Sequence, residues 1–128
     1  MSTTPQGHLV TTVHSTQTVT VEIDGEVVAR SKRPVVLYET GLPIRYYLPP
    51  EDVDLTRFEA TDTHTTCPFK GVASYWTYLG NGDTGPRPDV VWAYPEPIAS
   101  VPDIAGLLSF YDTVAQVTAE GEPPAPPA

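Results

Sequence analysis

The segment Thr18-Val19-Thr20-Val21-Glu22-Ile23-Asp24-Gly25-Glu26-Val27-Val28-Ala29-Arg30 has the pattern of a β-hairpin. Val19, Val21 and Ile23 alternate with polar residues, and this period of two places the apolar side chains on one face of a strand. Asp24-Gly25 is a dipeptide that tolerates the positive φ angles of a two-residue hairpin turn. We therefore predict two antiparallel strands joined by a tight turn.

The rest of the chain has the same strand-like character. Short turns separate the apolar runs, so neighbouring strands are expected to pair antiparallel as a meander. The fifteen prolines disfavour long helices, because a proline inside a helix costs about 3 kcal/mol. The sequence predicts a mainly β, small single-domain antiparallel sheet protein. Its further strands are expected at residues 35–39, 44–48, 72–79, 89–94 and 114–118.

Two short helical segments are also expected. Residues 51–58 fit a turn of helix with Val53, Leu55 and Phe58 directed inward. A second helix is predicted to begin at Ser100, which can cap it together with Asp103, while Pro102 suits the first turn. The apolar stripe of this helix would consist of Ile104, Leu107, Leu108 and Tyr111.

Length and composition suggest one domain between two loose ends. The 128 residues are enough for one hydrophobic core. Residues 1–15 are expected to be a loosely ordered lead-in, 16–118 the folded domain, and 119–128 a disordered Pro/Ala-rich tail. The chain shows neither a leader-like apolar run near its start nor the roughly 20 apolar residues of a membrane span. A cytoplasmic location is the expectation.

Charge and cysteine content narrow the function classes. Seven Lys and Arg against sixteen Asp and Glu give a net charge of −9. Because nucleic-acid binding depends on neutralising phosphates, this balance argues against nucleic acid and against an anionic membrane surface as partners. One cysteine cannot form an internal disulfide or a four-cysteine zinc site. We expect no cofactor and no metal.

The segment Thr63-His64-Thr65-Thr66-Cys67-Pro68-Phe69-Lys70-Gly71 is the first candidate for a site. Lys70 lies between two predicted strands, where it suits capture of a carboxylate or phosphate as a compact charge, or base and Schiff-base chemistry. The alternative is a surface lysine paired with a carboxylate. Cys67 would need a nearby histidine to act as a nucleophile, but three residues along a strand place His64 on the opposite face. A small buried side chain before a turn is the alternative for Cys67.

Glu39, Arg45 and Tyr47 form a second candidate group. Arg45 and Tyr47 are two residues apart and share a strand face, where they could line a polar pocket with Trp76 or Trp92 as a wall. Alternatively, Arg45 could form a structural ion pair with Glu39 across the hairpin. The sequence leaves both interpretations open.

A series of motifs occurs in order along residues 17–117. They are Val28-Ala29-Arg30-Ser31, Leu37-Tyr38-Glu39, Tyr46-Tyr47-x-Pro49, Asp52-Val53, Thr66-Cys67-Pro68-Phe69-Lys70-Gly71, Tyr75, Trp92-Ala93-Tyr94-x-x-Pro97 and Ile104-Ala105-Gly106-x-x-x-Phe110. Together these motifs resemble the bacterial and fungal "domain of unknown function 427" family, which is sometimes labelled nucleotidyltransferase-like. The resemblance implies a tent-like (Mss4-like) fold of mostly antiparallel strands. Relatives of that fold hold zinc with four cysteines, so the structural zinc is expected to be absent here and hydrophobic packing to replace it.

Three functions stay open at this point. The first is binding of a small polar or anionic metabolite in a pocket built from Glu39, Arg45, Tyr47, Cys67, Lys70 and Trp76. The second is a structural or protein-interaction module, with a homo-oligomer as one form. The third is the nucleotidyl transfer that the family label suggests, which needs a Gly-Ser start and paired aspartates holding two metal ions. Asp52-Val53-Asp54 has the aspartate spacing but follows Pro49-Pro50 without a phosphate-binding loop.

Overall fold

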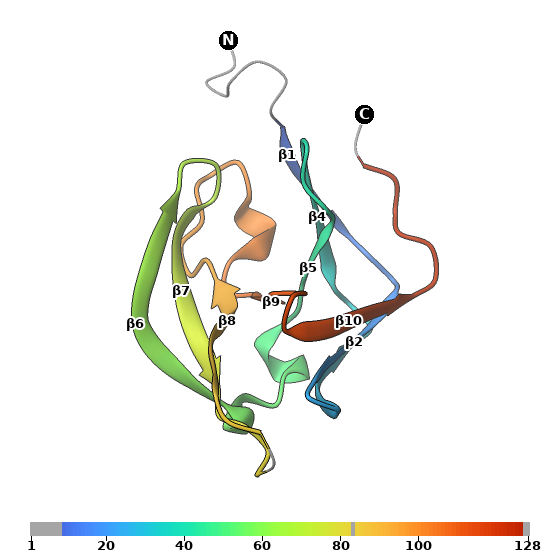
Figure 1. Cartoon of the computed structure of the whole chain (residues 1–128). Coiled ribbons are helices and arrows are strands. Elements are labelled where there is room, and N and C mark those ends of the chain that lie inside the picture. The colour runs from blue at the N-terminus through green and yellow to red at the C-terminus, as the bar shows by residue number, and fades with distance from the viewer. Residues whose placement is uncertain (1–8, 83, 127–128) are drawn as a thin grey trace.

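A computed structural model describes residues 9–82 and 84–126 of the chain (Figure 1). Strands dominate it, and its helical segments are single 3₁₀ turns, so the mainly β prediction is confirmed. The strands are β1 (Val10–His14), β2 (Thr18–Ile23), β3 (Glu26–Ser31), β4 (Val35–Glu39), β5 (Arg45–Tyr47), β6 (Phe58–Cys67), β7 (Gly71–Tyr78), β8 (Arg87–Ala93), β9 (Leu108–Phe110) and β10 (Ala115–Glu120). The 3₁₀ turns are η1 (Pro50–Asp52), η2 (Leu55–Arg57) and η3 (Pro102–Ile104).

The strands form three antiparallel sheets, in the orders β1-β4-β5, β10-β2-β3 and β6-β7-β8-β9. In Figure 1 the long strands β6 and β7 stand on one side of the molecule, and β1 and β4 stand on the other. Leu48 and Leu108 exchange two backbone hydrogen bonds of 2.8 Å. This bridge ties the end of β5 to β9, and so holds the first sheet against the four-stranded one.

The predicted hairpin is present as β2 and β3. Asp24 and Gly25 have φ angles of 50° and 83°, as a turn with two positive φ angles requires. Strands adjacent in sequence also pair antiparallel in β4-β5 and along β6-β7-β8-β9, as in a meander. The meander is interrupted between β3 and β4, because β4 pairs with β1 and β5 rather than with β3. Residues 10–14, expected in the loosely ordered lead-in, are the strand that takes this place beside β4.

The helix predicted from Ser100 is wrong. Its start is the single turn η3, without a side-chain cap, and Gly106 then reverses the chain with a φ of +71°. Leu108 and Phe110 lie in β9, which pairs with β8. The edge of β8 supplies backbone partners that a helix would have had to supply internally, and tertiary pairing therefore overrides the local helical pattern.

The segment 51–58 is likewise not one helical turn. It consists of η1 and η2, separated by an extended residue, Val53. Val53 and Phe58 are buried as expected, but Leu55 is 45% exposed. The backbone N–H of Val53 closes η1 on Pro50, and the N–H of Phe58 closes η2 on Leu55. With the bonds from Asp52 to Pro49 and from Arg57 to Asp54, each segment ends after two such hydrogen bonds.

The end of the described chain lies against the sheets. β10 pairs with β2, which confirms the predicted last edge strand and extends it to Glu120. Gln17 Nε2 donates a hydrogen bond to the carbonyl of Gly121 at 3.1 Å, and the Tyr38 hydroxyl donates one to the carbonyl of Pro124. Parts of the two expected terminal segments, residues 1–8 and 127–128, lie outside the described residues. Within the described residues, no helix is long and apolar enough to cross a membrane.

The buried side chains form two clusters that share strand β8. Val91 and Ala93 belong to the first cluster, between β8, β9 and the β10-β2-β3 sheet, whereas Trp92 belongs to the second, between β7, β8 and the β4-β5 pair. Successive residues of a strand point to opposite faces, so β8 serves both clusters. Tyr94, directly after β8, also belongs to the second cluster. The candidate site lies at the edge of this second cluster.

Candidate functional site

A pocket of about 170 Å³ opens beside the second cluster. We call it the aromatic pocket, since four aromatic residues line it. Its charged walls come from the end of β4, from β5 and from the β6–β7 turn, while β7, β8 and the segment after β9 supply the rings. The lining residues are Glu39, Leu42, Pro43, Arg45, Lys70, Tyr75, Trp92, Tyr94 and Tyr111.

Lys70 is held by the turn between β6 and β7. Its N–H donates to the carbonyl of Cys67 at 3.2 Å, and its carbonyl accepts from the N–H of Ile98 at 2.9 Å. Gly71 has a φ of +124°, and a Cβ there would lie 3.2 Å from the carbonyl oxygen of Glu96. Glycine therefore allows the loop at 96–98 to pack against the turn and fix the lysine's backbone.

Lys70 forms a short ion pair with Glu39. The distance from Lys70 Nζ to Glu39 Oε1 is 2.7 Å, and the two side chains are 12% and 6% exposed. Lys70 is therefore paired with a carboxylate, as the alternative interpretation expects, but the pair lies in the wall of a pocket rather than on the surface. Because desolvating two charges is costly, a buried pair of this kind is weak evidence for a purely stabilising role.

Arg45 forms the other charged wall. Its Nη1 lies 3.3 Å from Asp112 Oδ2, and its guanidinium carbon lies 5.6 Å from the centroid of the Trp92 ring. The alternative interpretation, an ion pair between Arg45 and Glu39, is therefore wrong, because Arg45 pairs with Asp112 and Glu39 pairs with Lys70. The contact with Trp92 is a cation–π interaction, which leaves several guanidinium N–H groups available to a ligand.

Tyr47 contacts Trp92 of the pocket but does not itself line the pocket. It is fully buried, and its hydroxyl accepts a hydrogen bond of 3.1 Å from Trp92 Nε1. The two rings meet edge to face, with centroids 6.3 Å apart. Burial raises the pKa of Tyr47 well above its usual value, so the hydroxyl stays protonated. Tyr47 shares a strand with Arg45 as expected, but it positions Trp92 instead of lining the pocket.

Trp92 and Tyr111 form an aromatic wall of the pocket, with ring centroids 4.5 Å apart and the ring planes tilted by 44°. The Tyr111 hydroxyl hydrogen-bonds with Tyr75, whose own hydroxyl lies 2.7 Å from Thr65 Oγ1. Burial, together with this hydrogen bond to Tyr75, raises the pKa of Tyr111 to about 12. Tyr111 therefore presents a neutral hydroxyl at neutral pH.

Tyr94 differs from the other tyrosines of the site. It is 6% exposed, yet its hydroxyl forms no hydrogen bond within the described residues. Every fully enclosed side-chain nitrogen or oxygen among these residues has a partner. It follows that the Tyr94 hydroxyl is not fully enclosed, and Tyr94 is one of the residues that line the pocket.

Besides Tyr47, two more of the expected site residues, Cys67 and Trp76, lie outside the pocket lining. Cys67 is half-buried and packs against the second cluster. Trp76 packs against the first cluster, because it follows Tyr75 on β7 and points to the other face of the strand. The wall that the sequence analysis assigned to Trp76 or Trp92 is supplied by Trp92.

Sequence reasoning missed Tyr75, Tyr94 and Tyr111 as site residues. Tyr75 and Tyr94 stand within the motifs that carry the family resemblance, which was the available signal. Tyr111 was assigned to a helix that does not form. The described residues contain no group of three or more His, Cys, Asp or Glu side chains that could hold a metal ion. His64 Nδ1 instead lies 3.3 Å from the carbonyl of Ala73.

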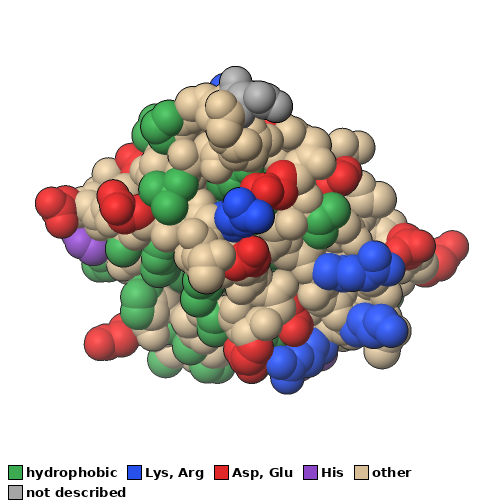
Figure 2. Space-filling view, turned by 90° about the horizontal axis from the view of Figure 1, so that it is seen from below, with side chains coloured by type: hydrophobic (Ala, Val, Ile, Leu, Met, Phe, Trp, Pro, Cys, Tyr) green, Lys and Arg blue, Asp and Glu red, His purple; other side chains and the backbone are tan. Residues whose placement is uncertain are grey.

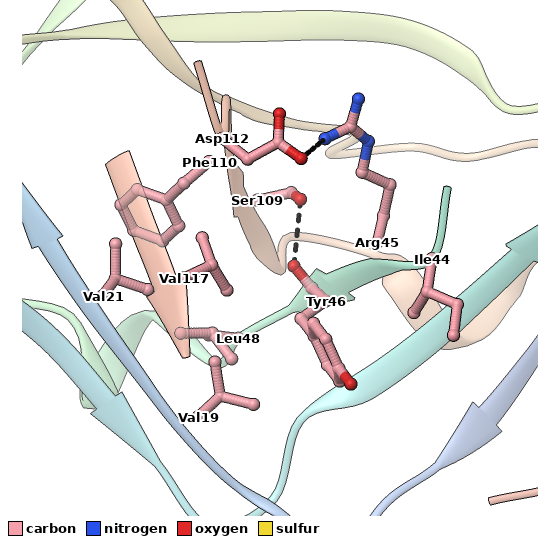
Figure 3. Close-up of a pocket in the computed structure, with 10 residues that line it drawn as sticks. All are labelled: Val19, Val21, Ile44, Arg45, Tyr46, Leu48, Ser109, Phe110, Asp112 and Val117. Atoms are coloured by element: carbon pink, nitrogen blue, oxygen red, sulfur yellow. Dashed lines mark hydrogen bonds and ion pairs between the residues drawn. The ribbon is translucent and has the colours of Figure 1, made fainter. Parts of the chain in front are cut away.

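A second, smaller hollow also has Arg45 in its lining (Figure 3). Its volume of about 30 Å³ is that of roughly one water molecule. Figure 3 shows the Arg45–Asp112 ion pair at its edge and the Ser109 hydroxyl donating to the carbonyl of Tyr46 at 2.9 Å. The rest of its lining is mostly apolar and comes from Val19, Val21, Ile44, Leu48, Phe110 and Val117. This hollow is a packing gap of the first cluster and too small for a metabolite.

The comparison with known proteins bears on the family. A search of curated proteins gave no match to this chain. A family model does match, and it spans nearly all of the strands described above. The matched family is the one described as Domain of unknown function (DUF427); it covers residues 11–121, and the chain belongs to it.

Proposed function

We propose that this protein binds a small polar or anionic metabolite in the aromatic pocket. The observation that carries the proposal is the Lys70–Glu39 pair, whose side chains are 12% and 6% exposed at the wall of an open pocket. Charged groups are rarely withdrawn from water to this degree without a strong partner or a function. Arg45 on the ring of Trp92 adds a second cation to the same pocket.

The size of the pocket supports a small ligand. Its volume of about 170 Å³ corresponds to about six water molecules at roughly 30 Å³ each. Sites for drug-sized ligands span about 300–1,000 Å³. A nucleoside triphosphate would therefore extend far outside the pocket. This favours metabolite binding over the nucleotidyl transfer that the family label suggests.

The charge distribution supports a small molecule over a nucleic acid or an anionic membrane. Among the described residues, Arg33, Arg45, Arg57, Lys70 and Arg87 each lie in an ion pair with a carboxylate. On the face seen in Figure 2, basic and acidic side chains lie close together. A phosphate backbone needs a continuous basic surface, which such pairing opposes. With one cysteine in the chain, we also propose a cytoplasmic location.

The test is an unbiased capture of ligands. The purified protein and the variant Lys70→Ala are each exposed to a small-metabolite extract, and retained compounds are identified by native mass spectrometry. Lys32→Ala, which removes an exposed lysine that is not part of the pocket lining, is the matched control. We expect a compound that is retained by the unmodified chain and by Lys32→Ala but lost by a folded Lys70→Ala.

The opposite result has an equally definite meaning. If neither the unmodified chain nor the control retains any compound, the binding function is refuted. A structural or protein-interaction module, including a homo-oligomer, would then be the better description. Retention that is equal in all three proteins would remove Lys70 from the site.

A further inference from the structure

We infer that the ligand of the aromatic pocket is a small monocarboxylate with a flat apolar body, whose carboxylate binds to Tyr94, Lys70 and Arg45. This inference rests on the proposed function and makes its ligand class specific. It combines the free hydroxyl of Tyr94, the balance of charges around the pocket, and the shape of the aromatic wall.

The first step concerns the hydrogen-bonding groups that face the pocket. The ammonium of Lys70 has three N–H donors, and Glu39 accepts one of them. Arg45 has five, and its carboxylate partner is Asp112. The Tyr94 hydroxyl has no partner within the described residues, and burial raises its pKa strongly, so it stays a donor at neutral pH. The group that satisfies several convergent donors is an anionic oxygen acceptor.

The second step concerns the net charge. Lys70 is balanced by Glu39, and Arg45 is balanced by Asp112. The pocket therefore offers strong donors without a large excess of positive charge. A phosphate dianion would bring two negative charges next to the carboxylate of Glu39, whereas a carboxylate brings one. The monoanion is the better match.

The third step concerns the body of the ligand. The rings of Trp92 and Tyr111 lie against each other at an angle of 44°, and Leu42 and Pro43 line the same pocket. Flat groups pack well on aromatic faces, and the volume of about 170 Å³ leaves room for little more than one ring beside the carboxylate. An aromatic or similarly planar acid fills this space.

The experiment uses benzoate as the probe and isothermal titration calorimetry at neutral pH. Benzamide has nearly the same shape without the charge, and phenyl phosphate replaces the carboxylate with a larger dianion. We expect benzoate to bind at least about tenfold more tightly than either analogue. Tyr94→Phe should weaken benzoate by about tenfold or more, as expected for the loss of a hydrogen bond to a charged group.

The matched control is Tyr46→Phe, which also removes a tyrosine hydroxyl but from a residue outside the aromatic pocket. It should change the affinity for benzoate by less than about twofold, since it touches none of the donors. Equal binding of benzoate and benzamide, or an unchanged affinity in Tyr94→Phe, overturns the inference. A carboxylate captured from the extract that loses affinity in Tyr94→Phe supports it even where benzoate itself binds poorly.

Different results would overturn the binding function and the monocarboxylate inference. A captured compound that depends on Lys70 but carries no carboxylate overturns the monocarboxylate and leaves the binding function standing. If the extract yields no retained compound and benzoate does not bind, both are overturned.

Discussion

The buried ion pair between Lys70 and Glu39 gives the sharpest prediction on stability. Replacing Lys70 by methionine keeps most of the side-chain volume but leaves the Glu39 carboxylate, 6% exposed, without its partner at 2.7 Å. Breaking a buried pair by removing one member costs about 3–5 kcal/mol. Because the pocket admits some water to the carboxylate, we expect Lys70→Met to lower the free energy of unfolding by about 2–4 kcal/mol.

The second variant separates this cost from a loss of packing. In Glu39→Gln/Lys70→Met the buried charge is removed together with its partner, so we expect at least about half of the lost stability to return. For a domain of 128 residues, a loss of 3 kcal/mol corresponds to a fall in Tm of about 10 °C. Lys32→Met, at an exposed lysine, should change the free energy of unfolding by no more than about 0.5 kcal/mol.

The assay is urea denaturation followed by tryptophan fluorescence, with Tm from circular dichroism as a second measure. Comparable m-values across the variants would show that the same unfolding transition is compared. The reasoning is refuted if Lys70→Met is as stable as the unmodified chain, or if the double variant loses the sum of the two single losses. Either result would mean that the pair is solvated in spite of its low exposure.

Three further predictions concern the surroundings of the pocket. Tyr47→Phe leaves the Trp92 N–H without its acceptor and should cost about 1–3 kcal/mol in urea denaturation. Gly71→Ala, at a φ of +124°, should destabilise by more than about 1 kcal/mol, whereas Gly85→Ala, where a Cβ meets open space, should lower Tm far less. Burial followed by the hydrogen bond to Glu26 raises the pKa of Tyr78 to about 12. The folded state thus holds this proton more tightly than the unfolded state, so stability should be full below about pH 10 and fall as pH rises toward 12, measured as Tm against pH. A Tm that is flat across this range would contradict the last prediction.

The parts of the fold that depend on local sequence were predictable. The hairpin of β2 and β3 needs only an alternation of apolar residues and a turn dipeptide, and both stand within thirteen residues. The segment after Ser100 shows the limit of such reasoning. Its capping residues and apolar spacing favour a helix, but Leu108 finds partners in β8 and in Leu48, which lies 60 residues earlier. Local patterns carry no information about such distant partners.

In the candidate site too, the sequence predicts individual residues but not their contacts with distant parts of the chain. Lys70 and Glu39 could be selected from the sequence because they stand in motifs that carry the family resemblance, and Arg45 because it shares a strand face with Tyr47. The pairing of Lys70 with Glu39 could not be predicted, because the two residues are 31 positions apart. Glu39 ends β4, whereas Lys70 lies in the turn between β6 and β7. The choice between Tyr75 and Trp76 depends on which face of β7 is turned toward β4, and only the assembled sheets fix that.

The double use of β8 has a consequence for how the molecule fluctuates. Trp92 of the pocket and Val91 of the other cluster are adjacent in one interior strand, so the pocket cannot come apart while the remainder stays intact. Opening of this strand should then coincide with whole-domain unfolding, and its amide protons should be among the slowest to exchange with deuterium. A ligand held against Trp92 would accordingly protect the entire cooperative unit, including residues far from any contact with it.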